Sequence, residues 1–156
     1  MKIETLVDTS AVVAATRSRK AKVAALADAL AGAGPEELPL VVSYLGGALL
    51  QRRTGLGWRG LQSLPDPAAD SSLTVGEVHD ALEGLAALSG SGSQLARAAA
   101  TAELFGRATE PEQVWLRGLV TGELRQGALD ALVQEALAVA AAVPVAAVRR
   151  AAMLSG

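Results

Sequence analysis

Apolar residues recur along most of this chain at the spacing of a helix that buries one face. The clearest example is the segment 109–140, in which two such patterns flank a short connection, 122–127, that has glycine at both ends. Apolar positions three and four residues apart lie on the same side of an α-helix. We therefore predict two packed helices, with buried faces formed by Trp115, Leu116, Leu119 and Val120 in the first and by Leu129, Leu132, Val133, Ala136, Leu137 and Ala140 in the second.

Polar residues of the capping type stand before several of the apolar patterns. The run Thr109–Glu112 has the form of a capping box, with Pro111 in the first turn, where a proline removes no needed amide donor. Thr74 and Glu77 repeat the capping box, and Ser18 is a candidate N-cap. These signals predict where three helices begin.

The remaining apolar patterns predict further helices. The expected segments are 1–16, 18–32, 35–49, 74–88, 95–105 and 145–154. In the third of these, Tyr44 lies at the edge of the apolar stripe or off it. The fifth follows the connection Ser89–Gln94 and should bury one face made of Leu95, Ala98, Ala99, Ala102 and Phe105.

Two other stretches have no helical period and are predicted to be loops. Residues 51–60 hold three arginines and three glycines around Trp58, and residues 65–72 are polar and rich in proline. The second loop separates two halves, but neither half has enough apolar surface to fold comfortably alone. We therefore expect one all-α domain over residues 1–156, a single compact unit with about eight to ten helices.

Composition narrows the chemistry that this domain can perform. The chain is 51% hydrophobic and only 3% aromatic, which favours close-packed helices over a sheet. It has no cysteine and a single histidine, His79, which excludes a disulfide scaffold and a zinc site of the usual Cys/His kind. No stretch has the length and apolarity to span a bilayer and no secretion signal is present, so a cytoplasmic location is expected.

The glycine-bounded connection 122–127 is the first candidate site. Glycine can end one helix and leave the first amides of the next uncovered, and such amides at the positive end of a helix dipole suit a phosphate oxygen. Arg125 lies within the connection and could add a charge-assisted contact. The alternative is an ordinary turn with a solvated arginine.

Two further segments have comparable features. Small residues in Ser89–Gln94 would expose the first amides of the following helix, although a plain flexible linker needs no function. Arg52 and Arg53 stand in the loop 51–60, which is either a surface connection with Trp58 filling the core or a loop near phosphate. The net charge of −2 weighs mildly against nucleic-acid binding, although basic residues do gather locally, as in the segment 17–22.

Four stretches in register give the chain a resemblance to a known family. GELRQG at 122–127 resembles the G-x-L-R-x-G signature of the N-terminal DNA-binding domain of ATP-dependent DNA ligases. SYLGGALLQRRTGLGW at 43–58, SGSGSQ at 89–94 and ELF at 103–105 occur in the same order as in that family. The resemblance covers nearly the whole chain and is greatest with the small bacterial ligases that carry this domain. Some relatives have a lysine in the loop at 89–94 that this sequence lacks.

The resemblance implies a domain that straddles a nick in duplex DNA over the minor groove and helps the catalytic domains close around it. It implies contacts to sugar and phosphate rather than to base edges, since a ligase must seal nicks in any sequence. Arg125 is the first choice for a side chain that enters the minor groove. The full set of expected DNA-binding residues is Gly122, Arg125, Gln126, Gly127, Gly92, Ser93, Gln94, Arg52 and Arg53.

The adenylation chemistry of a ligase needs a lysine nucleophile in a K-x-D-G setting. The three lysines here, Lys2, Lys20 and Lys22, all lack that setting, so no catalytic residue and no cofactor are expected for this domain. By resemblance, ATP and Mg²⁺ serve a nucleotidyltransferase domain and an OB-fold that follow in the same polypeptide, and the chain is expected to be part of such a bacterial nucleoid enzyme. The competing interpretation is a helical protein–protein interaction module, marked by an exposed apolar groove in place of a basic face.

Overall fold

The computed structural model describes residues 1–51, 54–57, 59–124 and 127–141. Over this part of the chain it is all-α, with no β-strand and one isolated bridge between Lys2 and Thr74, which confirms the predicted fold class. The predicted helix 145–154 and the predicted packing of Trp58 lie outside the described residues. The elements are α1 (Ile3–Ala15), α2 (Arg19–Ala31), α3 (Leu38–Leu45), the 3₁₀-helix η1 (Arg59–Leu61), α4 (Val75–Ala87), α5 (Ser93–Gly106), α6 (Glu110–Thr121) and α7 (Gly127–Ala141).

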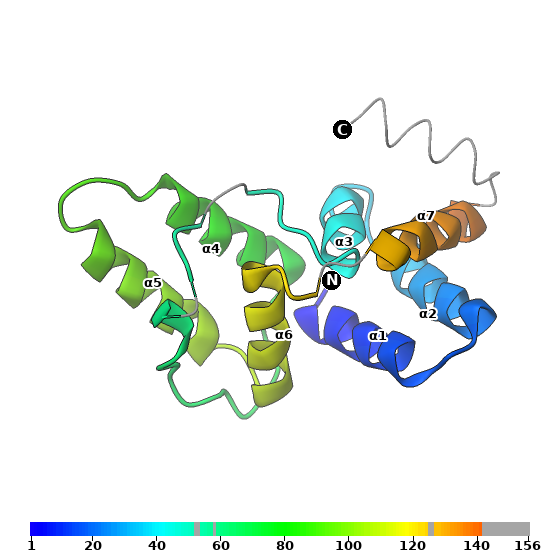
Figure 1. The fold of residues 1–156 in the computed structure, drawn as a ribbon, viewed down its shortest axis with the longest axis horizontal. Helices are drawn as coiled ribbons and strands as arrows, with labels where there is room; N and C mark the ends of the chain where they lie inside the picture. Colours follow the sequence, from blue (N-terminus) through cyan, green and yellow to red (C-terminus); the bar gives the residue numbers. More distant parts are fainter. Residues whose placement is uncertain (52–53, 58, 125–126, 142–156) are drawn as a thin grey trace.

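Helix α6 stands between two groups of helices (Figure 1). Helices α1, α2, α3 and α7 lie to one side of it, and α4 and α5 lie to the other. The chain leaves the first group after α3 and returns to it with α7, which packs against α2 more extensively than any other pair of helices does in the described part. The two ends of the described chain therefore meet in one group of helices.

Trp115 fixes α6 against the first group. Its side chain is only 5% exposed, and its Nε1 donates a hydrogen bond of 3.1 Å to Ser10 Oγ on α1. Its ring packs edge-on against the ring of Tyr44 on α3, with 6.3 Å between the ring centroids. Tyr44 is 1% exposed, so the expectation that it lies at the edge of its stripe is wrong. Helix α3 has neighbours on several sides, among them α1, α4 and α7, and a single apolar stripe therefore does not describe its buried surface.

The first turn of α6 holds a buried carboxylate. Glu112 is 1% exposed, and its two oxygens accept hydrogen bonds of 2.8 Å from the Thr109 amide and from Ser71 Oγ. The first bond is the predicted interaction between the third helical residue and the cap. The second ties the loop 65–72 to the start of α6, so this loop is held in place although its sequence has no helical period.

The next residue, Gln113, connects α6 to the second group of helices. Its side-chain amide donates to the carbonyl of Phe105 at the end of α5, at 2.8 Å, and to the carbonyl of Pro65, at 3.1 Å. One acceptor lies in the last turn of α5 and the other in the loop that precedes α4. Helix α6 is therefore bonded to helices on both of its sides.

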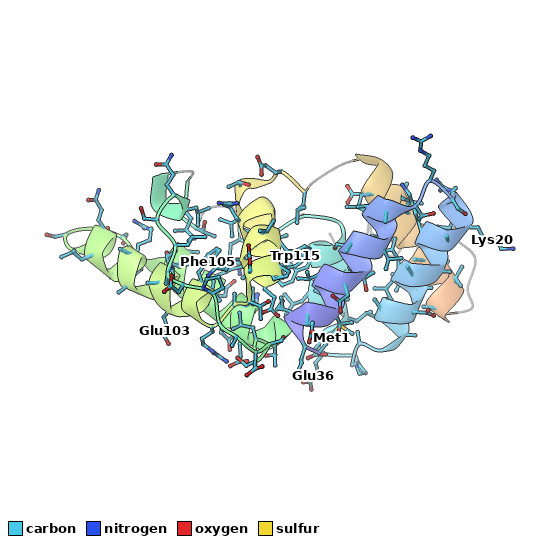
Figure 2. The ribbon with its side chains drawn as sticks, turned by 90° about the horizontal axis from the view of Figure 1, so that it is seen from below. Met1, Lys20, Glu36, Glu103, Phe105 and Trp115 are labelled. Atoms are coloured by element: carbon cyan, nitrogen blue, oxygen red, sulfur yellow. The ribbon has the colours of Figure 1, made fainter. Side chains whose placement is uncertain are left out.

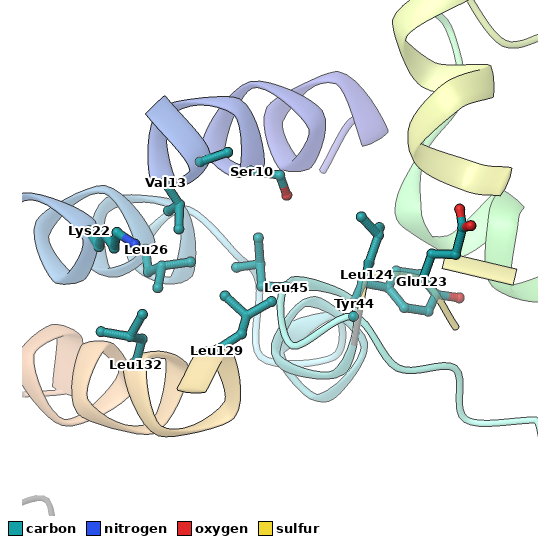
Figure 3. Close-up of a pocket in the computed structure, with 12 residues that line it drawn as sticks. Ser10, Val13, Lys22, Leu26, Tyr44, Leu45, Glu123, Leu124, Leu129 and Leu132 are labelled. Carbon is teal, nitrogen blue, oxygen red and sulfur yellow. The ribbon is translucent and has the colours of Figure 1, made fainter. Parts of the chain in front are cut away.

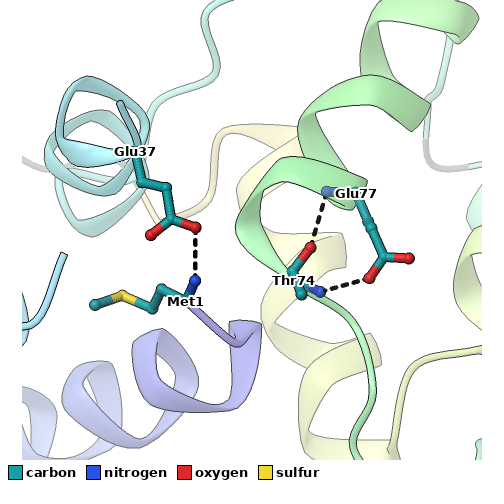
Figure 4. A network of polar contacts seen from close by, with 4 residues as sticks. All are labelled: Met1, Glu37, Thr74 and Glu77. Carbon is teal, nitrogen blue, oxygen red and sulfur yellow. Dashed lines mark hydrogen bonds and ion pairs between the residues drawn. The ribbon is translucent and has the colours of Figure 1, made fainter. Parts of the chain in front are cut away.

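The start of the chain lies between α3 and α4 (Figure 4). The Met1 amine donates to Glu37 Oε1 at 2.6 Å, and the Met1 carbonyl accepts from the Val75 amide at 2.9 Å. Beside it, Thr74 and Glu77 form the predicted capping box, with both bonds at 3.1 Å. Ser18 also caps α2 as predicted, because its hydroxyl accepts from the Ala21 amide.

The predicted buried face of α5 is wrong except for Phe105. Leu95 is 80% exposed, and the three predicted alanines, Ala98, Ala99 and Ala102, are exposed too. The buried positions of this helix are Thr101, Leu104 and Phe105. More than half of a folded protein's surface is apolar, so a run of alanines gives the period of a helix without saying which side is buried.

The other predicted faces agree better with the structure. Trp115, Leu116 and Leu119 are buried on α6, and Val120 is half-buried. On α7 the central positions are buried and Ala140 is exposed. Helix α3 ends at Leu45, so half-buried Leu49 lies beyond it. Within the described ranges, no helix has both the length and the apolarity that crossing a membrane requires.

We predict that Glu112→Ala lowers the free energy of unfolding by about 2–3 kcal/mol, because it leaves the Thr109 amide and the Ser71 hydroxyl without their acceptor. The exposed Glu103 on α5 offers a control, and Glu103→Ala should change stability by less than about 0.5 kcal/mol. Urea unfolding followed by circular dichroism measures both. Equal effects of the two substitutions would contradict the role given to the buried carboxylate.

Two carboxylates should make the free energy of unfolding depend on pH in the acidic range. The hydrogen bond from the Met1 amine holds the pKa of Glu37 below its ordinary 4.5, and the hydrogen bond from Arg107 does the same for the pKa of Glu77. A lowered pKa in the folded state contributes stability that is complete above 4.5 and is lost as the pH falls through the lowered value. Unfolding free energy should therefore fall between about pH 5 and pH 3, and more shallowly in Glu37→Gln. A parent and a variant with the same pH profile would refute this.

Candidate nucleic-acid interface

The turn after α6 is built as the glycine pattern predicts, as far as it is described. Gly122 has a φ of +81°, in the left-handed region that favours glycine, and it ends α6. The Leu124 amide then donates to the Gly118 carbonyl at 3.2 Å and reverses the chain. Gly127 is the first residue of α7. Arg125 and Gln126 lie outside the described residues.

Leu124 anchors this turn, a role that the sequence analysis missed. A Cβ built on Gly118 would lie 3.0 Å from Leu124 Cγ, so the leucine rests directly on the glycine of α6. Its side chain also lines a cavity of about 410 Å³ between α1, α2, α3 and α7, close to Tyr44 and Glu123 (Figure 3). The signal in the sequence was a lone leucine between two glycines, Gly122 and Gly127.

A groove runs beside the end of α6. Its volume is about 620 Å³, and Gly122 lines it together with Leu119, Val120 and Thr121 of α6. The opposite wall is formed by the segments 47–51 and 54–56. Arg52 and Arg53 fall in the gap between those segments and lie outside the described residues. The structure therefore brings Gly122 and the backbone that flanks these two arginines to one surface.

The start of α5 is open to solvent, as predicted. Gly92 is the N-cap residue with a φ of +80°, and no side chain accepts a hydrogen bond at this cap. Gly92 and Gln94 are exposed and Ser93 is half-buried. The positive end of the helix dipole is therefore accessible here.

A second groove, of about 570 Å³, leads from α5 to the same loop. Gln94, Arg97 and Ala98 line its α5 side, and Gly55 and Leu56 line the facing side. Gly55 and Leu56 also line the groove beside α6. The loop segment 54–56 thus joins the surface near Gly122 to the surface near Gln94. Figure 2 shows the end of α6, the start of α7 and η1 toward one edge of the molecule.

Several charged residues near the helix ends have structural partners. Arg19, from the basic segment 17–22, pairs with Glu135 and joins α2 to α7. Arg107 pairs with Glu77 at 2.7 Å and joins the end of α5 to α4. The described part of the chain contains no group of three or more histidine, cysteine, aspartate or glutamate residues that could hold a metal ion.

The described elements define a compact helical domain in which the end of α6 and the first turn of α5 border two grooves that share one loop. Residues 61–138 match the family described as "DNA ligase N terminus", and the chain belongs to that family. This finding agrees with the resemblance that the four stretches carry.

Proteins with the name "Probable DNA ligase" are similar over almost the whole chain. The one from Nocardioides sp. is 65% identical over 99% of this chain, and the one from Kineococcus radiotolerans is 60% identical over all of it. The protein from Streptomyces griseus is 51% identical, also over the full chain. The chain spans about a third of the length of these relatives, 30% to 32%. They are enzymes by name, and this chain matches a segment of them.

Two helical glycines test the contact between Leu124 and α6. Gly84→Ala on α4 meets no atom within 4 Å and should raise stability by about 0.5–1 kcal/mol through its higher helix propensity. Gly118→Ala should be less stable than Gly84→Ala by about 1 kcal/mol or more, because its methyl group meets Leu124. Thermal unfolding of both variants measures the difference. Equal stabilisation at the two positions would show that Leu124 does not rest on Gly118.

Proposed function

We propose that this chain binds nicked duplex DNA without sequence preference and so places the nick for the catalytic domains of an ATP-dependent DNA ligase. The observation that carries the proposal is the common surface formed by the end of α6, the loop segment 54–56 and the first turns of α5, in a chain of the DNA ligase N-terminus family. These are the segments whose glycines carry the family resemblance.

Helix starts supply the attraction for phosphate in this proposal. The start of α5, near Gly92, Ser93 and Gln94, has no side-chain cap and stands at the positive end of the helix dipole. The Ser93 amide donates to the Gly90 carbonyl at 3.2 Å, so the amides that follow it are the ones assigned to phosphate. Gly127 begins α7 after the reversal at Gly122. Backbone amides bind the oxygens that every nucleotide carries, and such contacts fix the register of a protein on DNA without reading bases.

Arginines outside the described residues supply the positive charge. Arg125 follows directly after the anchored Leu124, and we assign it to the minor groove, with Gln126 beside it. We assign Arg52 and Arg53 to phosphates next to the groove that Gly122 lines. Glycine at 122 and 127 lets the backbone approach the sugar-phosphate chain closely.

The remaining chemistry belongs to other domains in this proposal. ATP, Mg²⁺ and the lysine that carries the adenylate would lie in the catalytic domains of the longer enzyme, in the same polypeptide. This chain would contribute affinity for the nick and its orientation. Sealing of nicks is needed in DNA repair, replication and recombination.

A titration of fluorescent duplexes, nicked and intact, at two salt concentrations tests the proposal. If about four phosphates are contacted, log affinity should fall with log salt at a slope of roughly −3 to −4, and the dissociation constant should be micromolar or weaker. Arg125→Ala should reduce the slope by about 1. Lys20→Ala, which removes an equal charge on α2 far from the grooves (Figure 2), serves as the control and should leave affinity unchanged.

Two results would reject the proposal. One is the absence of binding to either duplex at low salt, and the other is binding that does not respond to salt. If Arg125→Ala and Lys20→Ala lose the same affinity, the chain binds DNA, but the turn at 122–127 is not the site of contact.

The exposed side of α5 favours a second candidate function, a contact with another protein. Leu95 is 80% exposed, and Ala98, Ala99 and Ala102 continue the same uncharged surface. A face of this kind accepts a partner helix more readily than it accepts phosphate. Failure of DNA binding together with self-association that Leu95→Ser abolishes would favour this function.

A further inference from the structure

We propose that Arg97 is a positioning residue that holds the loop segment 54–57 and the connection 89–94 in a fixed relation for DNA binding. This inference rests on the proposed function, because it assigns to Arg97 the placement of two segments that carry or adjoin candidate DNA contacts. Arg97 lies on α5, one turn after Gln94.

The guanidinium lies directly on the backbone of Gly55. A Cβ built on Gly55 would lie 2.3 Å from Arg97 Nε and 2.6 Å from Cζ, distances that real atoms do not reach. Gly55 also has a φ of +74°, which a side chain would strain. Glycine at this position is therefore required twice, once for the conformation of the loop and once for the contact with Arg97.

The same guanidinium is bonded to the end of α4. Its Nη2 donates to the Leu88 carbonyl at 3.2 Å, and Leu88 is the C-cap residue of α4. A cation is favourable at this negative end of the helix dipole. Leu88 directly precedes the connection 89–94, so Arg97 contacts the start of one candidate segment and the middle of the other.

Stability alone does not account for an arginine here. Its Nε is buried without a hydrogen-bond partner, and no ion pair in the described part of the chain includes Arg97. Burial of an incompletely bonded cation is unfavourable, and an apolar side chain of similar length would fill the space without that loss. The planar group does, however, give the loop a flat surface and a directed bond that an apolar chain cannot supply.

A direct contact between Arg97 and phosphate is the competing role, since the side chain lines the groove beside α5. The two roles differ in salt dependence and in hydrogen exchange. A phosphate contact is lost with its charge, so Arg97→Ala would then reduce the salt slope by about 1 and leave exchange in the two segments unchanged. A positioning role predicts instead that Arg97→Ala raises exchange in both segments, and that Gly55→Ala, which keeps every charge, weakens binding with an unchanged salt slope, because its Cβ separates the loop from the guanidinium.

The experiment is a double-mutant cycle with Gly55→Ala, Arg97→Ala and the double variant, and Gly57→Ala as the control. Gly57 lies in the same loop and has no atom within 4 Å of an added Cβ. We measure affinity for the nicked duplex and, by hydrogen exchange, protection of the peptides that hold 54–57 and 88–94. The strain at φ +74° is present with and without Arg97, so it cancels from the cycle.

We expect each single substitution to weaken binding about tenfold, and the double variant to be no weaker than the worse single one. Arg97→Ala should also raise exchange in both peptides, and Gly57→Ala should change neither quantity. Arg97→Met keeps most of the side-chain volume and replaces Arg97→Ala if that variant unfolds.

Two results would overturn the inference if the parent binds DNA. One is a double variant whose loss of affinity is the product of the two single losses, and the other is unchanged exchange in both peptides after loss of Arg97. A loss of affinity in Arg97→Ala alone, with a salt slope reduced by about 1, would identify a phosphate contact instead. A parent that binds no DNA would reject the proposed function and, with it, the DNA-binding role of Arg97. Hydrogen exchange would then still decide whether Arg97 holds the two segments together.

Discussion

The position of α6 governs the rest of the structure, and Trp115 is the contact that sets it. This side chain reaches Ser10 on α1 and Tyr44 on α3, whereas Gln113 on the same helix bonds to Phe105 at the end of α5 and to Pro65. Helix α6 is therefore bonded to both groups of helices. One groove borders the end of α6 and the other borders α5, so the distance between them depends on core packing rather than on the loops themselves.

Three glycines near the grooves serve three different physical purposes. Gly122 supplies a left-handed conformation that ends a helix, Gly118 supplies room for Leu124, and Gly55 supplies both the conformation and the room that Arg97 needs. A glycine-rich sequence is usually taken as evidence of a flexible chain. Here two of these glycines permit close contacts that hold the connecting segments to helices, and a held segment loses less entropy when it binds DNA.

Sequence reasoning succeeded where the determining interactions are local. The caps at Ser18 and Thr74 join residues only three positions apart, and the turn at Gly122 follows from one backbone conformation. It failed for Leu95, because period alone does not say which side of an alanine-rich helix is buried. Sequence reasoning did not single out Arg97, since its partner Gly55 lies on a distant segment that the sequence does not connect to it.

The use of arginine inside the fold bears on how tightly the proposed domain can hold DNA. Arg19 and Arg107 are engaged with carboxylates, and Arg97 lies against backbone, so these three contribute more to the arrangement of helices than to the field outside. With a net charge of −2, few cations are then available for phosphate. Affinity for DNA rises with the number of phosphates that a protein neutralises, so with few available cations binding by this domain alone should be weak and easily reversed. In the proposed ligase, tight capture of a nick would then require the catalytic domains, whose tethering would raise their effective concentration at the site.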